Sequence, residues 1–526
     1  MGGGLLTALI FLPLLGGLFV IMQRDGRSVW NSAFVFSLIP LALSFYLFYA
    51  FDPHSADYQF AEQYAWIPQL GISYHLGVDG ISLLLVVLTT ILISLSLLYS
   101  AGGDIEERPR EFCFFILVLE TGLLGALLAV DVFLFYVFWE VMLIPMYFLI
   151  GIWGHGRRIY AAIKFVLFTM FGSILMLVAI IYLAYSEHVH FGRLSFDLPL
   201  MFQVPLTPTE ARWLFAAFAL AFAIKVPMWP VHTWLPDAHT EAPTAGSVIL
   251  AGVMLKMGAY GFLRFAIPLF PAVAVEATAL FMALAVVGII YGAMVAMVQP
   301  DLKRLVAYSS VSHLGFVMLG IFALNMQGVE GAIYQMLNHG ISTGALFLLV
   351  GMVYLRRHTR EISEFGGLWR SVPVMAAVFM VVMLSSIGLP GLNGFVGEFL
   401  IMLGTFLRQW VAAAFAVSGI VLGALYMLWA YERVMFGPIT KAVNETLRDL
   451  DAREIAVLVP VIALMLFMGL YPRPLLARME PSVAKMLSAV RVEEANRHEQ
   501  QDRLTRLAIP AGRPEQNSSV SAVAAK

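Results

Sequence analysis

Residues 222–230 read Phe222-Ala223-Ile224-Lys225-Val226-Pro227-Met228-Trp229-Pro230, which places one lysine beside two prolines in an apolar stretch. An ammonium group at the centre of a bilayer costs about 2.5 to 3.5 kcal/mol. Neither proline can donate a backbone hydrogen bond, so a helix must open here. In lipid, the freed carbonyls are tolerated only where protein or water satisfies them. The run therefore predicts a broken membrane helix with a candidate ion or proton site at Lys225.

The composition predicts an all-α, polytopic membrane protein. The chain is 60% hydrophobic and 13% charged, and its mean hydropathy is +0.84. These values lie far outside the range of soluble domains. Apolar segments long enough to cross a bilayer recur along the chain. Fourteen spans are predicted, at residues 5–22, 29–50, 79–100, 112–129, 132–152, 160–185, 211–234, 243–267, 273–298, 304–325, 330–355, 374–403, 411–436 and 455–472.

The basic residues predict an orientation for these spans. The loops after odd-numbered spans carry most of them, whereas the opposite loops hold chiefly Arg193, Arg212 and Arg408. By the positive-inside rule, the first set faces the cytoplasm of a bacterial-type inner (cell) membrane. Both termini are then expected on the periplasmic side. The basic loop residues are Arg24, Arg27, Arg108, Arg110, Arg157, Arg158, Lys303, Arg304, Arg356, Arg357, Arg360 and Arg370.

The cysteine and glycine content argues against cofactor chemistry in this chain. Cys113 is the only cysteine, which excludes an intrachain disulfide and a thiolate iron–sulfur cluster. No phosphate-binding G-x-x-x-x-G-K-[ST] run is present, and the glycine pairs lie inside predicted helices. We therefore expect no redox or nucleotide cofactor in the chain itself.

Ionisable residues within the spans predict an inverted repeat. Lys225 follows Glu140 by 85 residues, and Glu398 follows His313 by the same interval. The seventh span is interrupted at Pro227 and Pro230, and the twelfth at residues 388–394. Paired interrupted segments in two halves point to a transport site. The predicted units are 1–111 (spans 1–3 and an external loop), 112–267 and 268–436 (two five-helix repeats), 437–472 (a cytoplasmic loop and the last span) and 473–526 (a polar tail).

Six buried ionisable residues form the candidate proton pathway. Histidine and lysine suit this role because small changes of environment alter their protonation. Four of them also have a structural reading. Glu140 would only bond a neighbouring helix, and Lys225 would only cap the carbonyls that its prolines free. The two histidines would only be hydrogen-bonded core residues. The pathway residues are Glu140, Lys225, Lys256, His313, His339 and Glu398.

Other polar residues in or beside the spans receive different predictions. Glu120, Lys164 and Asp131 are secondary candidates, and Arg264 is expected to snorkel to the membrane surface. The run 236–243 holds two acids and a histidine and could bind a metal, but Asp237 and Thr240 read more simply as helix caps, with Pro243 in a first turn. An external loop is expected at 52–78. In the tail, an amphipathic stretch near 479–507 precedes a disordered end.

Two long motifs carry a family resemblance. Residues 225–264, from Lys225-Val226-Pro227 through Lys256, and residues 301–313 closely resemble the proton-conducting, antiporter-like subunits of respiratory complex I, as does most of the chain up to about residue 475. Among the L, M and N types of that family, a glutamate in the twelfth span is typical of M. Residues 138–147 also resemble that type, whereas Glu120 matches no position of the family's pattern.

This resemblance implies a function in a larger assembly. The chain would be a non-redox membrane subunit of an NADH:quinone oxidoreductase and would conduct protons through Glu140, Lys225, Lys256, His313, His339 and Glu398. FMN, iron–sulfur clusters and quinone would be bound in partner subunits, and the neighbours would be L- and N-type subunits. Two alternatives stay open here: a subunit of a multi-subunit cation/proton antiporter, and a scaffold whose polar groups only join helices.

Overall fold

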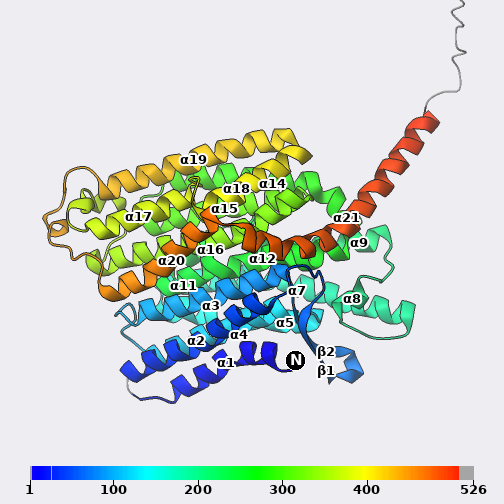
Figure 1. Cartoon of the computed structure of the whole chain (residues 1–526), viewed down its shortest axis with the longest axis horizontal. Helices are drawn as coiled ribbons and strands as arrows, with labels where there is room; N and C mark the ends of the chain where they lie inside the picture. The colour runs from blue at the N-terminus through cyan, green and yellow to red at the C-terminus, as the bar shows by residue number, and fades with distance from the viewer. Residues whose placement is uncertain (1–2, 25, 509–526) are drawn as a thin grey trace, which may run out of the picture.

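The computed structural model describes residues 3–24 and 26–508, and it is a bundle of long helices that lie roughly parallel or antiparallel to one another (Figure 1). One two-stranded sheet lies at one end of the bundle. The helices are α1 (Leu5–Ile21), α2 (Gly26–Ala50), α3 (Gly80–Ser100), α4 (Pro109–Leu128), α5 (Val132–Val141), α6 (Leu143–Trp153), α7 (Arg158–Phe191), α8 (Leu198–Met201), α9 (Pro208–Lys225), α10 (Trp234–Glu241), α11 (Thr244–Ile249), α12 (Leu255–Gly261), α13 (Ile267–Leu269), α14 (Pro271–Met297), α15 (Leu302–Phe322), α16 (Met326–Arg357), α17 (Pro373–Ser386), α18 (Asn393–Arg408), α19 (Trp410–Met435), α20 (Ala452–Leu470) and α21 (Arg473–Ala508).

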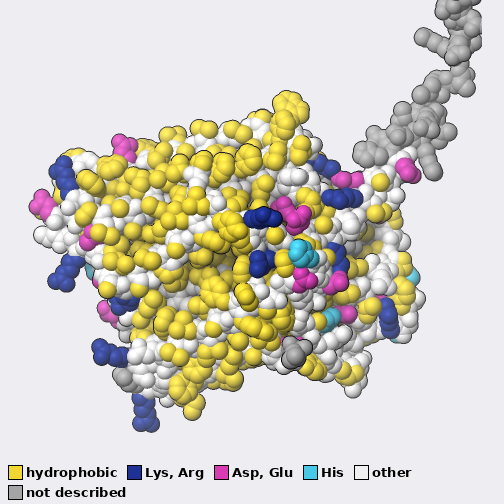
Figure 2. All heavy atoms as spheres, viewed as in Figure 1, with side chains coloured by type: hydrophobic (Ala, Val, Ile, Leu, Met, Phe, Trp, Pro, Cys, Tyr) yellow, Lys and Arg dark blue, Asp and Glu magenta, His cyan; other side chains and the backbone are white. Residues whose placement is uncertain are grey.

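The helical membrane fold is confirmed, but the count of fourteen spans is not. Each predicted segment contains helix, and eleven helices of the described residues are long and apolar enough to cross a membrane. The helices in the other three predicted segments are too short or too charged to be counted among these eleven. α1 and α17 are shorter, with 17 and 14 residues. α9 has only 18 residues and carries Glu210, Arg212 and Lys225. The visible face is mostly hydrophobic, with charged side chains at its left edge and in a group right of its centre (Figure 2).

Both predicted helix breaks are present. α9 ends at Lys225, and residues 226–233 form turns before α10 begins. α17 ends at Ser386, and α18 starts at Asn393, after Gly388 and Gly391 in the left-handed region with φ of 77° and 94°. The breaks thus lie where proline removes donors and where glycine permits a left-handed backbone. The inverted repeat that they suggested stays a prediction.

The two most enclosed spans carry Lys256 and His339 of the pathway. The best 18-residue windows of residues 244–269 and of α16 are fully buried, whereas that of α2 is only 28% buried. The 244–269 span is not a regular α-helix. Two π-helical segments, η2 (Leu250–Met254) and η3 (Phe262–Ala266), flank the α-helical turns of α12 that carry Lys256. Such π-turns are rare and are often found at functional sites.

The expected external loop at 52–78 contains a hairpin that was not predicted. Strands β1 (Gln59–Ile67) and β2 (Ile72–Val78) pair antiparallel and are joined by the short 3-10 turn η1 (Pro68–Leu70) and Gly71, which has a φ of 68°. Glu62 of β1 is buried and accepts hydrogen bonds from Leu6 N (2.7 Å) and Thr7 Oγ1 (2.5 Å). The hairpin therefore caps the start of α1.

The amphipathic stretch predicted near 479–507 is the helix α21. It packs against α16, α14, α3 and α13, and its far end extends away from the bundle (Figure 1). Ion pairs fix it to other elements: Lys485 Nζ with Asp57 (2.7 Å), Arg408 with Glu494 (2.5 Å) and Arg497 with Glu276 (2.9 Å). The predicted disordered end falls largely at 509–526, outside the described residues.

Candidate functional site

Glu140 and Lys225 lie near one another without a direct ion pair. Glu140, near the end of α5, is partly buried and accepts a hydrogen bond from Ser173 Oγ of α7. Lys225 is only 2% exposed, and its Nζ lies 5.1 Å from the ring centroid of Trp139 and 5.7 Å from that of Phe165. In the described part of the chain, no contact within 4.0 Å joins the two charges. They therefore interact through the electric field rather than through a hydrogen bond.

Other groups satisfy two backbone carbonyls at the break beside Lys225, of which Pro227 frees that of Ala223. Trp234 Nε1 donates to Ile224 O at 2.9 Å, and the backbone N–H of Met228 donates to Ala223 O at 2.9 Å. The structural reading of Lys225 as the cap of this break is therefore wrong for these two carbonyls. The ammonium is held beside aromatic faces, which attract a cation and leave its proton available.

Lys256 contacts a histidine from a distant part of the chain. Its Nζ lies 2.6 Å from His339 Nδ1 of α16 and also donates to Ala251 O, in the π-helical segment η2. Lys256 is fully buried, and His339 is 2% exposed. Because a neutral imidazole nitrogen accepts what an ammonium donates, this contact is a route for proton transfer between the two side chains.

His313 and Glu398 continue the row from His339. The rings of His313 and His339 have centroids 5.9 Å apart, and His313 Nδ1 lies 3.3 Å from Glu398 Oε1. Glu398 accepts a hydrogen bond from Gln335 Nε2 (3.1 Å), and Asn338 donates to Gln335 Oε1 (3.0 Å). The side chains of His313, His339 and Glu398 thus come together from α15, α16 and α18.

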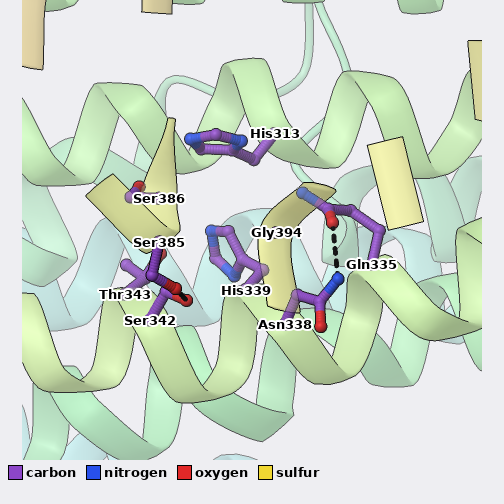
Figure 3. A pocket seen from close by; sticks show the side chains of 9 residues that line it. All are labelled: His313, Gln335, Asn338, His339, Ser342, Thr343, Ser385, Ser386 and Gly394. Atoms are coloured by element: carbon purple, nitrogen blue, oxygen red, sulfur yellow. Dashed lines mark hydrogen bonds between the residues drawn. The ribbon is translucent and has the colours of Figure 1, made fainter. Parts of the chain in front are cut away.

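Two small cavities flank His313. The first is about 10 Å³ and lies between His313 and His339, as Figure 3 shows. The second, of similar size, lies among His313, Glu398 and Tyr426. About 10 Å³ is the space that one water molecule needs, provided that two or more polar groups surround it. Hydroxyl, amide and imidazole groups line the first cavity: His313, Gln335, Asn338, His339, Ser342, Thr343, Ser385 and Ser386. Single waters could therefore connect the histidines with each other and with Glu398.

The segment that carries Lys225 contacts the segment that carries Lys256 where α12 packs against the end of α9. A Cβ on Gly258, two residues after Lys256, would lie 2.6 Å from Phe222 O and 2.8 Å from Val226 N. Only a glycine permits this approach. The structure therefore brings Lys256, His339, His313 and Glu398 into one row, and it places the helix of Lys256 directly against the break that carries Lys225.

The secondary candidates have three different environments. Asp131 caps α5 by accepting from Phe133 N and Leu134 N and also accepts from Ser73, so its role is structural. Lys164 pairs with Asp237 at 2.7 Å. Glu120 is fully buried in α4, and neither carboxylate oxygen has a hydrogen-bond partner among the described residues.

Three predictions for polar residues are wrong. Arg264 does not snorkel: it is 9% exposed and pairs with Asp79 at 2.6 Å, with further bonds to Tyr58 and Tyr260 (3.0 Å each). Asp237 and Thr240 are not caps, because both lie inside α10, whose cap residue is Thr233. Pro243 precedes α11 as its N-cap instead of standing in the first turn.

Sequence reasoning used the serines near the histidines but missed the amides around Glu398 and His339. Gln335, Asn338 and Ser342 stand three and four residues apart in α16, with His339 among them, so they share one face of the helix. That spacing was a usable signal. Asn393, at the start of α18, was not predicted either; it donates to Ser342 Oγ (3.3 Å) and accepts from Ser385 Oγ (2.5 Å).

A buried row of lysine, histidine and glutamate, with Glu398 just after a helix break, is typical of proton-conducting membrane proteins. The chain belongs to the NADH:quinone oxidoreductase/Mrp antiporter membrane family, whose model matches residues 129–470. It is similar to proteins named NADH-quinone oxidoreductase subunit M. That of Rhodobacter capsulatus is 47% identical over 92% of this chain and 96% of its own length. That of Mycobacterium tuberculosis is 41% identical over 92% and 94%.

Solved structures agree with this assignment. A chain of respiratory complex I from Thermus thermophilus with bound NADH is 33% identical, with a TM-score of 0.83 and coverage of 92% of this chain and 100% of that one. A chain of the Mrp complex from Dietzia sp. is 22% identical, with a TM-score of 0.79, over 93% and 99%. At that identity the second likeness shows the shared fold alone.

Proposed function

We propose that this chain is an M-type membrane-arm subunit of a proton-translocating NADH:quinone oxidoreductase and conducts protons across the membrane for that enzyme. The observation that carries the proposal is the buried row from Lys256 through His339 and His313 to Glu398, with contacts of 2.6 Å at one end and 3.3 Å at the other. The similarity to proteins named subunit M, over nearly the full length of both chains, supports the same assignment.

The chemistry of this chain is proton transfer along fixed side chains. Lys256 donates to His339 Nδ1, the two imidazoles exchange a proton through the first cavity, and His313 exchanges it with Glu398. A change of charge at Glu140 acts on Lys225 through the field, because Trp139 and Phe165 keep water away from the ammonium. Each pKa unit that such a field moves is worth about 1.4 kcal/mol, so a few units supply a useful part of a pumping step.

The redox steps belong to partner subunits in this proposal. FMN, iron–sulfur clusters and quinone are bound elsewhere, and the single cysteine, Cys113, is buried within α4. The neighbouring subunits in the membrane arm are the L and N types. Glu140 is only partly buried at mid-membrane, where a carboxylate facing lipid is costly, and a neighbouring subunit would cover it.

The proposed location is a bacterial inner membrane with both termini on the periplasmic side. The start of α1 and helix α21 both contact the hairpin segment, through Glu62 and Asp57, so they lie at the same end of the bundle. The opposite end gathers the loops rich in arginine, which the positive-inside rule assigns to the cytoplasm. There Arg360 pairs with Asp301 (3.2 Å) and Arg356 with Glu454 (2.6 Å).

The experiment compares two lysine-to-methionine variants in the whole complex. In inverted membrane vesicles, NADH-driven quinone reduction and proton uptake are followed together for Lys256→Met and for Lys485→Met, whose side chain is 56% exposed and pairs only at the surface. We expect proton uptake to fall at least about tenfold in the first variant and to be unchanged in the second. Normal uptake in Lys256→Met vesicles that contain the subunit would refute the pathway. A loss of sodium- or potassium-driven proton exchange, with NADH-driven uptake intact, would instead assign the chain to an antiporter.

A further inference from the structure

The loop between α3 and α4 turns one acidic side chain inward. Asp104 is only partly buried as a residue, yet its Oδ2 atom is shut off from solvent and has no hydrogen-bond partner among the described residues. Its Oδ1 accepts one long hydrogen bond, from Thr244 Oγ1 at 3.4 Å. The hydroxyl of Tyr99 is buried nearby, beside the same threonine. The Asp104 carboxylate, at the edge of the bundle, therefore points into the bundle and has few hydrogen-bond donors around it.

Structural aspartates in the same chain look different. Asp131 accepts bonds from Phe133 N, Leu134 N, Ser73 N and Ser73 Oγ, and its Ser73 bonds are 2.9 and 3.0 Å. Asp79 caps α3 and pairs with Arg264. A carboxylate that only holds structure uses its oxygens in this way, because an unmade bond to a buried acceptor costs about 1–3 kcal/mol. Asp104 has one long hydrogen bond to Oδ1 and none to Oδ2 among the described residues. This favours a role in which the carboxylate gains and loses a proton over a purely structural role.

Burial and the neighbouring positive charge act on the pKa of Asp104 in opposite directions. Burial raises the pKa of Asp104 to about 6, and the positive charge of Lys303 opposes this rise. Lys303 is 4% exposed and is held in place by donating to Ala242 O. The charged and titratable groups around this loop are Tyr99 on α3, Lys303 on α15, Arg356 on α16, and Arg453 and Glu454 on α20; Arg453 donates to Ala101 O and Gly102 O.

The position of Asp104 connects the loop end of the bundle to the buried row. Thr244, its hydrogen-bond donor, is the first residue of the span that carries Lys256 twelve residues later, about 18 Å along a helix. Polar groups lie between them. Ser247 donates a hydrogen bond to His239 O, and the imidazole of His239 interacts electrostatically with both Lys303 and Lys256. Neither nitrogen of that buried ring has a partner among the described residues.

We infer that Asp104 is the group through which this subunit exchanges protons with water at the loop end, and that Lys303 sets the charge of that group. This inference rests on the proposed function. The carboxylate takes a proton from water and passes the same proton inward, so the step leaves Asp104 as it began. Lys303 is a positioning residue, because its positive charge lowers the pKa of the Asp104 carboxyl group.

The test measures the pH profile of NADH-driven proton uptake in vesicles that contain the whole complex. The variants are Asp104→Asn, Asp104→Glu and, as the matched control, Glu106→Gln, which neutralises an exposed acid of the same loop. Wild-type uptake should fall as the pH drops through about 6, since a protonated Asp104 cannot accept another proton. Above pH 6, we expect the uptake rate of Asp104→Asn to be at least about tenfold lower than that of the wild type. The fall in uptake at acid pH (the acid limb of the profile) should be absent from Asp104→Asn and present in Asp104→Glu and Glu106→Gln.

A second variant keeps the test decisive if Asp104→Asn fails to assemble. In Lys303→Gln, the loss of the positive charge should move the acid limb to a higher pH, because the protonated acid is then favoured. An unchanged limb in that variant, or a wild-type rate and profile in Asp104→Asn, would overturn the inference. If either occurs while Lys256→Met still abolishes uptake, the proposed function stands and only the role of Asp104 falls.

Discussion

The buried ion pair between Arg264 and Asp79 permits a quantitative test of what holds the hairpin end of the bundle together. Their side chains are 10% and 6% exposed, and the two atoms of the pair lie 2.6 Å apart. Asparagine caps a helix about as well as aspartate, so Asp79→Asn keeps the cap of α3 and removes only the charge. Breaking a buried pair by removing one partner costs about 3–5 kcal/mol, because the other charge is left uncompensated.

The assay is thermal unfolding of the purified complex in detergent, with the amount of assembled subunit in membranes as a second readout. A loss of about 3–5 kcal/mol is more than a hundredfold in the folding equilibrium, so both readouts should fall clearly in Asp79→Asn and in Arg264→Met. The double variant Asp79→Asn/Arg264→Met should lose less than the sum of the two, because it leaves no isolated charge. Two single variants as heat-stable as the wild type would refute the reasoning. Lys485→Met, which breaks only an exposed pair, is the control and should cost less than about 1 kcal/mol.

Three further predictions concern the pathway and its surroundings. His339→Gln removes the ring that Lys256 contacts, so vesicle proton uptake should fall at least about tenfold; an unchanged rate would exclude His339 from the route. Gly397→Ala would place a Cβ 2.7 Å from Gln335 Oε1 and 2.9 Å from Gln335 N, so it should impair uptake, whereas Gly288→Ala, with no atom within 4 Å, should not. Burial raises the folded-state pKa of Asp104 to about 6, so its protonated form stabilises the fold fully below about pH 4, and this stability is lost as the pH rises through 6. The unfolding midpoint of Asp104→Asn should therefore rise relative to the wild type between pH 4 and 7, and a constant difference would contradict this.

The broken spans and the pathway residues could be predicted because each has a local cause. Proline at 227 and 230 removes backbone donors, and the glycines at 388 and 391 permit a left-handed backbone, so the breaks follow from a few neighbouring residues. A charge within an apolar segment is also visible locally. The membrane class and the candidate row were therefore accessible from the printed sequence.

What failed depends on residues far apart in the chain. Arg264 lies near a predicted span end, and only the position of Asp79, 185 residues earlier, shows that its charge is buried. The hairpin was missed because β1 alternates poorly, with exposed and partly buried residues along most of its length, and its one buried acid serves the start of α1.

The two π-helical segments beside Lys256 make its span tolerant of a change in residue number. Each residue of an α-helix turns the chain by about 100°, and a π-turn accommodates one residue more than an α-turn. Deleting one residue from 250–254 would therefore let regular α-helix form while the residues after it kept their direction, and Lys256 would still face His339. A deletion of the same size in α16 before His339, where no π-turn absorbs it, would instead rotate His339 by about 100° away from Lys256. The hydropathy of α16 would hardly change, so such a frame-preserving deletion would silence the subunit while leaving a membrane helix of ordinary appearance.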